Sequence, residues 1–111
     1  MSGLQAFDLS EIEARQAEAQ RPYFEFLRRP GFSMGTYLLR AGASDHQTPH
    51  SADEVYVVLR GSGTLRVEGE DTPAKAGSVL SVDQGKEHQF VDVSEDLQVL
   101  VIFAPPEDPQ T

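Results

Sequence analysis

The amino-acid sequence predicts an all-β fold, a sandwich or a barrel, with one short helix before the first strand. Two observations predict this class. Short apolar runs rich in β-branched and aromatic residues recur along the chain after residue 23, and clusters containing glycine separate them. Many short strands divided by turns are typical of sandwiches and barrels. We find no internal repeat and no linker, so the 111 residues fit one domain.

The first element is a predicted helix over residues 10–20. Ser10 can act as its N-cap, and Glu13 stands three residues later, as in a capping box. Pro22 ends the segment because proline cannot continue a helix. Apolar residues are few in this helix, so we expect it on the surface, where it can cover an edge of the sheet.

The strands follow in order, and residues 54–60 (EVYVVLR) form the clearest of them. Glycine-containing turns are expected at residues 61–63, 69–71 and 83–85. The predicted strands are residues 32–39, 54–60, 64–68, 78–82, 88–93 and 97–104.

The strands at residues 54–60 and 97–104 are apolar on both faces. In an antiparallel sheet, one such face lines the interior and the other also needs a cover. The helix is too polar to cover all of that surface, so a second copy of the chain is the simplest cover. The sequence therefore predicts a homodimer.

Composition excludes several classes of partner. The chain carries 18 acidic and 9 basic residues, a net charge of −9, so nucleic acid and anionic membrane surfaces would be repelled. Residues 1–9 lack the basic start and apolar run of a secretory signal, and no apolar stretch is long enough to span a membrane. We expect neither nucleic acid nor membrane as a partner, and a cytoplasmic location.

Three residues can build a metal site. His50 and Glu54 are separated by four positions, which in a straight strand span about 13 Å. The chain must therefore fold back at residues 51–53, so that His50 ends one strand and Glu54 begins the next, opposite it. His88 follows the turn at 83–85 and opens another strand. Cysteine is absent, so nitrogen and oxygen must bind the ion, which could be Fe, Mn, Zn, Ni or Co.

Two segments resemble the paired motifs of the cupin family. Residues 42–61 (GASDHQTPHSADEVYVVLRG) resemble the first motif, and residues 77–92 (GSVLSVDQGKEHQFVD) resemble the second. The resemblance implies a small single-domain double-stranded β-helix, or jelly-roll, barrel. It also implies metal ligands at His50 and Glu54 from the first motif and at His88 from the second. On this basis residues 1–22 are the helix and lead-in, 23–104 the barrel and 105–111 a flexible proline-rich tail.

The first motif departs from the family at one chemically important position. The family usually has a histidine two residues before the second one, and this chain has Thr48. In an extended segment Thr48 would face the same way as His50, and it could bind a metal-bound water. His46 or Gln47 could instead supply the fourth ligand, so the sequence leaves three alternatives open.

Three function classes remain, one of which is a metal-free storage or structural barrel. A metal ion with open positions could bind a small oxygen-bearing metabolite in an oxygenase- or isomerase-type enzyme, with Tyr56 or Arg60 helping to orient the substrate. Alternatively, the barrel could be a non-catalytic small-ligand-binding or sensory module. Because one fold supports many reactions, the catalytic residues, the substrate and the reaction do not follow from it.

Overall fold

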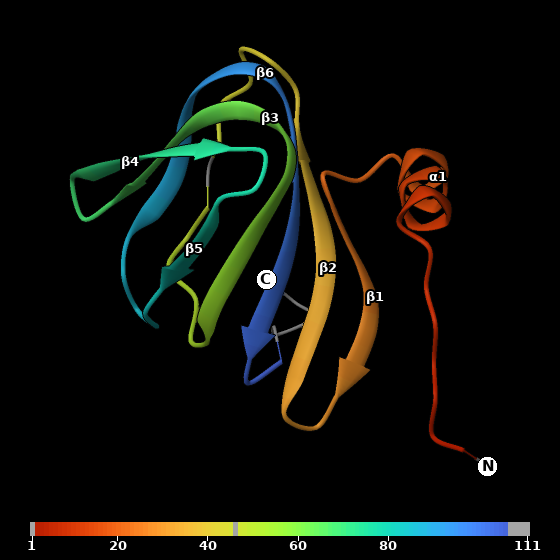
Figure 1. The fold of residues 1–111 in the computed structure, drawn as a ribbon. Coiled ribbons are helices and arrows are strands. Elements are labelled where there is room, and N and C mark those ends of the chain that lie inside the picture. The colour runs from red at the N-terminus through yellow and green to blue at the C-terminus, as the bar shows by residue number, and fades with distance from the viewer. Residues whose placement is uncertain (1, 46, 107–111) are drawn as a thin grey trace.

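The computed structural model describes residues 2–45 and 47–106, and Figure 1 shows their fold. One helix precedes a sheet of six strands. The elements are α1 (Leu9–Ala19), β1 (Tyr23–Arg29), β2 (Phe32–Leu39), β3 (Asp53–Val67), β4 (Glu70–Lys75), β5 (Val79–Val82) and β6 (His88–Ala104). The expected all-β class and the single short N-terminal helix are confirmed.

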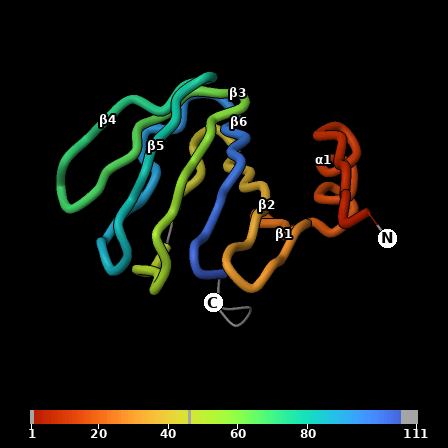
Figure 2. Tube along the Cα trace, turned by 60° about the horizontal axis from the view of Figure 1, so that its bottom comes forward, coloured from red at the N-terminus to blue at the C-terminus, as the bar shows by residue number. Residues whose placement is uncertain are grey.

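Every strand pair is antiparallel, and the strand order is β1-β2-β6-β3-β4, with β5 paired to β3. The two long strands, β3 and β6, pair with each other along most of their length and bend together at one end of the molecule (Figure 1). β5 pairs with the first part of β3 and β4 with its last part. The bend folds the sheet onto itself as a double-stranded β-helix, with β4 and β5 on the opposite side from α1 (Figure 2).

Two predicted breaks in the strands are wrong. Residues 54–60 and 64–68 belong to one strand, β3, and residues 88–93 and 97–104 belong to one strand, β6. The expected turn at residues 61–63 is instead the bend of β3, where the register against β6 shifts three times between Val58 and Thr64. Gly61 has a φ of 98°, and a Cβ there would collide with the Asp96 carbonyl oxygen of β6. Glycine permits this close crossing rather than a reversal of the chain.

β4 was not predicted, because a turn was expected over residues 69–71, where this strand in fact begins. The turn is only Glu68 and Gly69, whose φ angles are 49° and 80°. Two successive positive φ values are typical of a type I′ hairpin, which starts the return strand immediately. Pro73 is tolerated in β4 because this strand pairs only with β3 among the described residues.

The helix starts earlier than predicted. Its N-cap is Asp8 rather than Ser10, and no side-chain hydrogen bond caps it. Ile12 and Gln16 of α1 are buried, so the helix packs on the barrel through a narrow stripe. No helix within residues 2–45 and 47–106 is long and apolar enough to cross a membrane.

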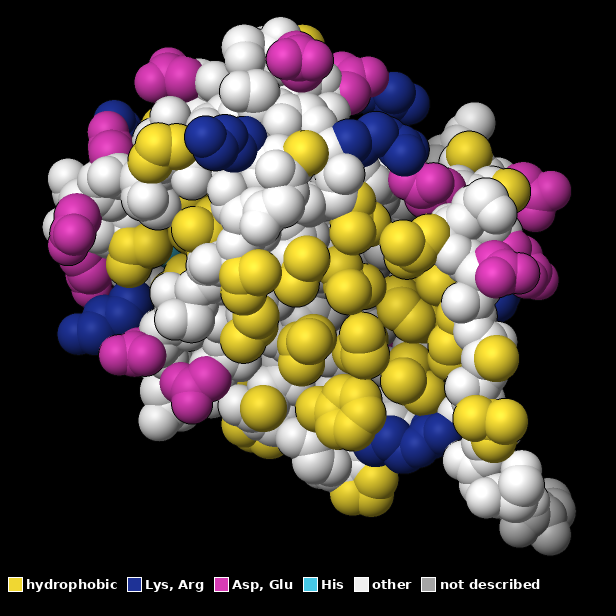
Figure 3. All heavy atoms as spheres, in the orientation of Figure 1, with side chains coloured by type: hydrophobic (Ala, Val, Ile, Leu, Met, Phe, Trp, Pro, Cys, Tyr) yellow, Lys and Arg dark blue, Asp and Glu magenta, His cyan; other side chains and the backbone are white. Residues whose placement is uncertain are grey.

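Burial alternates along β3 and β6, so the sheet has an inner and an outer face. Tyr56, Val58, Phe90 and Phe103 fill the interior, each at most 3% exposed. The opposite side, here called the outer apolar face, is only partly covered (Figure 3). It is formed by Met34, Val55, Val57, Val79, Leu100 and Ile102, which pair across β2, β6, β3 and β5.

Candidate metal centre

The site begins with a loop that follows β2 and reaches β3 at Asp53. Contrary to expectation, His50 does not end a strand: it lies in this loop, and the chain bends at residues 51 and 52. Two hydrogen bonds join the loop to the turn after β5. Gly85 N–H donates to the His50 carbonyl at 2.8 Å, and Gln84 N–H donates to Asp53 Oδ1 at 2.9 Å. These bonds bring the residues that lead into β6, and with them His88, beside His50.

Glu54 comes from the inner face of β3, where it pairs with Val82 of β5 and Phe103 of β6. Its side chain is 1% exposed. A carboxylate this deeply buried needs partners that compensate for lost hydration. The structure therefore brings one buried carboxylate against the two histidines, although the three residues come from a loop and two different strands.

The three side chains offer ligand atoms that all lie within 4.8 Å of one another. His88 Nε2 lies 2.9 Å from Glu54 Oε2, and His50 Nε2 lies 3.5 Å from Glu54 Oε1. Two bonds of about 2.0–2.2 Å from one ion place their ligand atoms about 3–4 Å apart. The spacing of the three side chains is therefore compatible with one shared divalent ion after small movements.

The backbone carbonyl of Lys86, two residues earlier, orients the His88 ring. Its Nδ1 lies 2.8 Å from the Lys86 carbonyl oxygen, which can only accept, so Nδ1 carries the ring proton. Nε2 then presents a lone pair, and among the described residues it has no hydrogen-bond partner although it is buried. A backbone carbonyl that fixes the tautomer of a histidine in this way is typical of metal-binding imidazoles.

The pKa of His88 is raised above its ordinary value. Burial alone would lower it, because burial disfavours the charged ring. A hydrogen bond to Glu54 that forms when Nε2 takes up a proton, the bond to Lys86 and the charges of Glu54 and Asp45 together outweigh this effect. Protons therefore compete for the same nitrogen that a metal ion would use.

Two aromatic side chains enclose the site. The Phe103 ring centroid is 5.2 Å from that of His50, and the Tyr56 ring centroid is 6.3 Å from that of His88. Tyr56 Oη lies 3.3 Å from Glu54 Oε1. Burial and the charge of Glu54 raise the pKa of Tyr56 well above its ordinary value, so its hydroxyl stays neutral and can donate.

Of the three candidates for a fourth ligand, the structure places one at the site and one in an exposed position. Gln47 Oε1 lies 3.4 Å from His50 Nε2 and 3.3 Å from Tyr56 Oη, so this amide faces the site. Thr48 is exposed. His46 lies outside the described residues.

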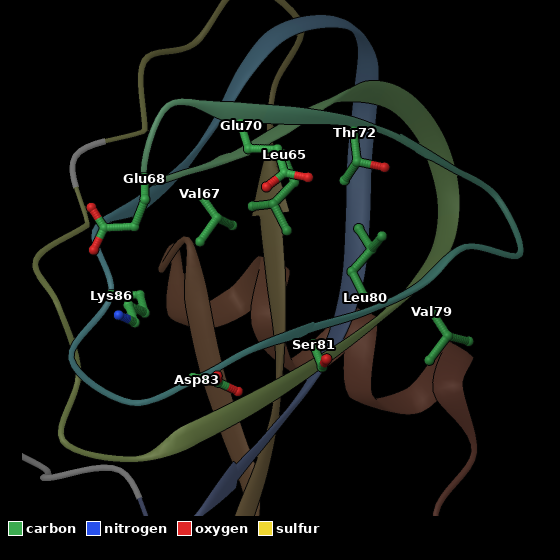
Figure 4. Close-up of a pocket in the computed structure, with 10 residues that line it drawn as sticks. All are labelled: Leu65, Val67, Glu68, Glu70, Thr72, Val79, Leu80, Ser81, Asp83 and Lys86. Carbon is green, nitrogen blue, oxygen red and sulfur yellow. The ribbon is translucent and has the colours of Figure 1, made fainter.

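A hollow of about 540 Å³ lies between the β3–β4 hairpin and β5 (Figure 4). It combines apolar Leu65, Val67 and Leu80 with charged groups at its edges, such as Glu70 and Lys86. The described residues that line it do not include His50, Glu54 or His88.

A smaller hollow, about 450 Å³, reaches the site itself. Its lining includes His88, Gln47, Thr48 and Arg66. This hollow offers a small molecule a route to the three ligand residues. Arg60, expected as a residue that orients substrate, forms an ion pair with Glu13 of α1 at 2.5 Å, so the structure places it against the helix instead.

Sequence reasoning missed Asp45 and Tyr37. Asp45 is 3% exposed and accepts hydrogen bonds from the Tyr37 hydroxyl, the Gln47 amide and the Phe90 backbone N–H. No local pattern could have linked residue 45 to residue 90, because their contact exists only once the loop lies against β6.

Comparison with known proteins gives the same fold. A family model described as "Cupin domain" matches residues 35–103. "Uncharacterized protein SCO3923" from Streptomyces coelicolor is 46% identical over 104 residues, which cover 94% of this chain and 99% of that protein. Auxin-binding protein 1 from Arabidopsis thaliana is 38% identical over 81 residues, which cover 61% of this chain and 41% of that protein.

Solved structures resemble this one across most of the chain. KdgF from Halomonas sp. superposes with a TM-score of 0.72 and 20% identity, covering 80% of this chain and 82% of that one. An RmlC-like cupin family protein with a double-stranded β-helix fold from Methanocaldococcus jannaschii gives a TM-score of 0.68 and 15% identity, covering 75% and 78%. At these identities the likeness shows the fold.

Proposed function

Because the chain belongs to the cupin family, we propose that it binds one divalent metal ion through His50, Glu54 and His88. We propose further that a small oxygen-bearing molecule completes the coordination of that ion. Support comes from the convergence of two imidazoles and one carboxylate, a ligand set that leaves positions open on the ion. The hollow that reaches His88 gives such a molecule access.

One observation carries the metal proposal. His88 Nε2 is buried and has no hydrogen-bond partner among the described residues, although it lies 2.9 Å from a carboxylate oxygen. A buried polar atom without a partner is costly, and native structures usually give it one. A metal ion between His88 and Glu54 would satisfy both groups at once.

The favoured function is a metal-dependent enzyme of the oxygenase or isomerase type that acts on a small oxygen-bearing metabolite. When bound, an ion here would supply Lewis-acid chemistry, or dioxygen activation if it is iron. The chain itself would supply position and a dry environment. Phe103 packs its ring beside His50, and Tyr56 offers a neutral hydroxyl that can donate to an oxygen near Glu54.

A second candidate is a non-catalytic small-ligand-binding or sensory module. The raised pKa of Tyr56 makes its phenol a poor base at neutral pH. A relative named for binding, auxin-binding protein 1, also favours this reading. We further propose that the protein acts in the cytoplasm as a homodimer, through its outer apolar face.

Elemental analysis of protein purified without chelator tests the proposal. We expect close to one divalent ion per chain. Loss of a residue that only supports a metal ligand typically weakens metal binding by 10–100-fold. His88→Ala removes a ligand itself, so it should weaken binding of the ion by at least that much. Gln89→Ala, the next residue in β6, is the matched control and should retain the ion.

Full metal occupancy in His88→Ala would show that His88 is wrongly assigned. Since a deleted side chain can impair folding, circular dichroism is recorded for each variant, and Glu54→Gln provides a second test with almost unchanged shape. The identity of the ion also separates the candidates. Iron would favour oxygen chemistry, whereas zinc or nickel would leave both enzyme and binding module open.

A further inference from the structure

We propose that the amide oxygen of Gln47 is a fourth protein ligand of the ion, and that Asp45 is the positioning residue that directs this oxygen into the site. The inference rests on the proposed function, since it concerns the same ion. It goes beyond the three residues that the cupin motifs indicate, because neither Asp45 nor Gln47 belongs to that set.

The position of Gln47 Oε1 is the first support. It lies 3.4 Å from His50 Nε2, almost the distance that separates His50 Nε2 from Glu54 Oε1, 3.5 Å. Neighbouring ligands of one ion with bonds of about 2.1 Å are about 3.0–3.4 Å apart. The amide oxygen thus stands beside His50 as an adjacent ligand would.

The orientation of the amide is fixed by chemistry. Gln47 Nε2 lies 2.8 Å from Asp45 Oδ2. A carboxylate oxygen can only accept, so the NH₂ group must face Asp45 and the carbonyl oxygen must face the other way. The reversed amide would set two oxygens against each other at that distance. Asp45 therefore determines which end of the amide is presented to the site.

Asp45 is itself held firmly enough to do this. Its Oδ2 also accepts from the Phe90 backbone N–H at 2.7 Å, and its Oδ1 accepts from Tyr37 Oη at 2.6 Å. Three donors compensate for the burial of the carboxylate. Carboxylates that orient a ligand from behind are a recurrent feature of metal centres.

The departure in the first motif explains why a different residue would supply the fourth ligand. Thr48 stands where a histidine is usual, and its side chain is exposed. With Gln47 as a ligand, the site would combine two imidazole nitrogens with the carboxylate oxygen of Glu54 and a neutral amide oxygen. Oxygen donors suit Mn²⁺ better than a set richer in imidazole, so Gln47 should tilt the preference of the site away from Zn²⁺.

A simpler role for Gln47 must be distinguished from this one. Its oxygen could merely accept a hydrogen bond from the His50 ring or the Tyr56 hydroxyl. In that case removal of the amide would take away one competitor for His50 Nε2, and metal affinity would stay the same or rise. A ligand role predicts the opposite sign.

The first experiment measures Mn²⁺ and Zn²⁺ affinity by competition with a metal-binding dye, using the full chain. Gln47→Leu keeps a similar volume and removes the oxygen. We expect it to weaken Mn²⁺ binding by about tenfold or more, and Zn²⁺ binding by less. Gln5→Leu, the same change at an exposed glutamine before α1, is the control and should match the wild type.

The second experiment tests Asp45 through a double-mutant cycle. In Asp45→Asn the new amide can donate to Gln47, which allows the Gln47 amide to turn its NH₂ toward the site. We expect a 10–100-fold loss of Mn²⁺ affinity in the wild-type background. In the Gln47→Leu background the same change should alter affinity by less than twofold, because Asp45 acts through Gln47. If Asp45→Asn does not fold, Tyr37→Phe replaces it in the cycle.

The outcomes separate this inference from the proposed function. Tight wild-type binding that Gln47→Leu leaves unchanged or strengthens would overturn the inference and leave the three-residue site intact. Equal losses for Asp45→Asn in both backgrounds would overturn the positioning role. A wild-type chain that binds neither ion would overturn the proposed function and this inference together.

Discussion

The contact between His88 and Glu54 makes the stability of the protein depend on pH. We expect this dependence to have opposite signs with and without a bound ion. In the metal-free chain the pKa of His88 is raised, so the folded state holds a proton more tightly than the unfolded state. This contribution to stability is fully present below a pH of about 6.5, the ordinary histidine value. It is lost as the pH rises through the folded-state pKa.

A metal-loaded chain should show the reverse dependence. Imidazole must be neutral to bind an ion, so protons displace the ion as the pH falls. We expect the melting temperature of the loaded protein to fall between pH 7 and pH 5, while that of the chelator-treated protein falls as the pH rises above about 6.5. Thermal melts at half-unit intervals from pH 5 to pH 8 measure both profiles.

His88→Ala supplies the control for this pair of curves. Both slopes should flatten, since the variant lacks the nitrogen that takes up either the proton or the ion. Parallel profiles for loaded and chelated wild-type protein would contradict the assignment of His88 as a ligand.

At the scale of elements, a buried polar side chain of α1, Gln16, bonds the helix to the barrel. Gln16 is 3% exposed, and its Nε2 donates to the carbonyls of Arg21, Pro22 and Thr36. Its Oε1 accepts from Thr36 Oγ1 at 2.9 Å and from Gln98 Nε2 at 3.1 Å. The helix thereby covers one end of the outer face and satisfies the polar groups of β2 and β6 beneath it.

Replacement of this glutamine should loosen the helix. Gln16→Leu keeps the volume but leaves the buried amide of Gln98 without its acceptor. We expect a loss of about 1–3 kcal/mol in the free energy of unfolding, measured by urea denaturation at fixed protein concentration. Glu18→Leu, on the exposed side of α1, should stay within about 0.5 kcal/mol of the wild type. Equal midpoints for both variants would show that the network does not stabilise the fold.

Elements were predictable where local pattern and tertiary structure agree. The strand at residues 32–39 matches β2 residue for residue, and the helix is displaced by one position. The bend of β3 was not predictable, because a glycine that permits a close crossing has the same local signature as one that starts a turn. Gly61 needs its freedom only because Asp96 of β6 passes beside it.

The same distinction applies to the site. The three expected ligand residues could be found from their types and spacing, and the structure brings them together. The arrangement behind them could not be found, because Asp45 reaches Gln47, Tyr37 and Phe90 only through the folded loop. The choice between Gln47 and Thr48 likewise depends on the path of that loop rather than on alternation along an extended segment.

At the scale of the whole molecule, the outer apolar face is a surface that the single chain covers only in part. Val57 lies in the middle of it, between Leu100 of β6 and Val79 of β5. Val79 is 67% exposed, while Phe7, just before α1, and Leu9, its first residue, are 38% and 43% exposed. A continuous apolar surface of this kind usually marks an interface, and a symmetric dimer would bury it against its own copy.

Sedimentation at micromolar concentration tests this prediction. We expect the wild type at about 24 kDa, twice the 12.2 kDa chain mass. Val57→Glu should sediment as a monomer, because it buries an unpaired charge in the interface. Ala43→Glu adds the same charge at an exposed loop position and should remain dimeric. A clean 12.2 kDa wild-type species would refute the dimer.

Since all three proposed ligands come from one chain, the Val57→Glu monomer should still bind one ion, which separates loss of assembly from loss of the site.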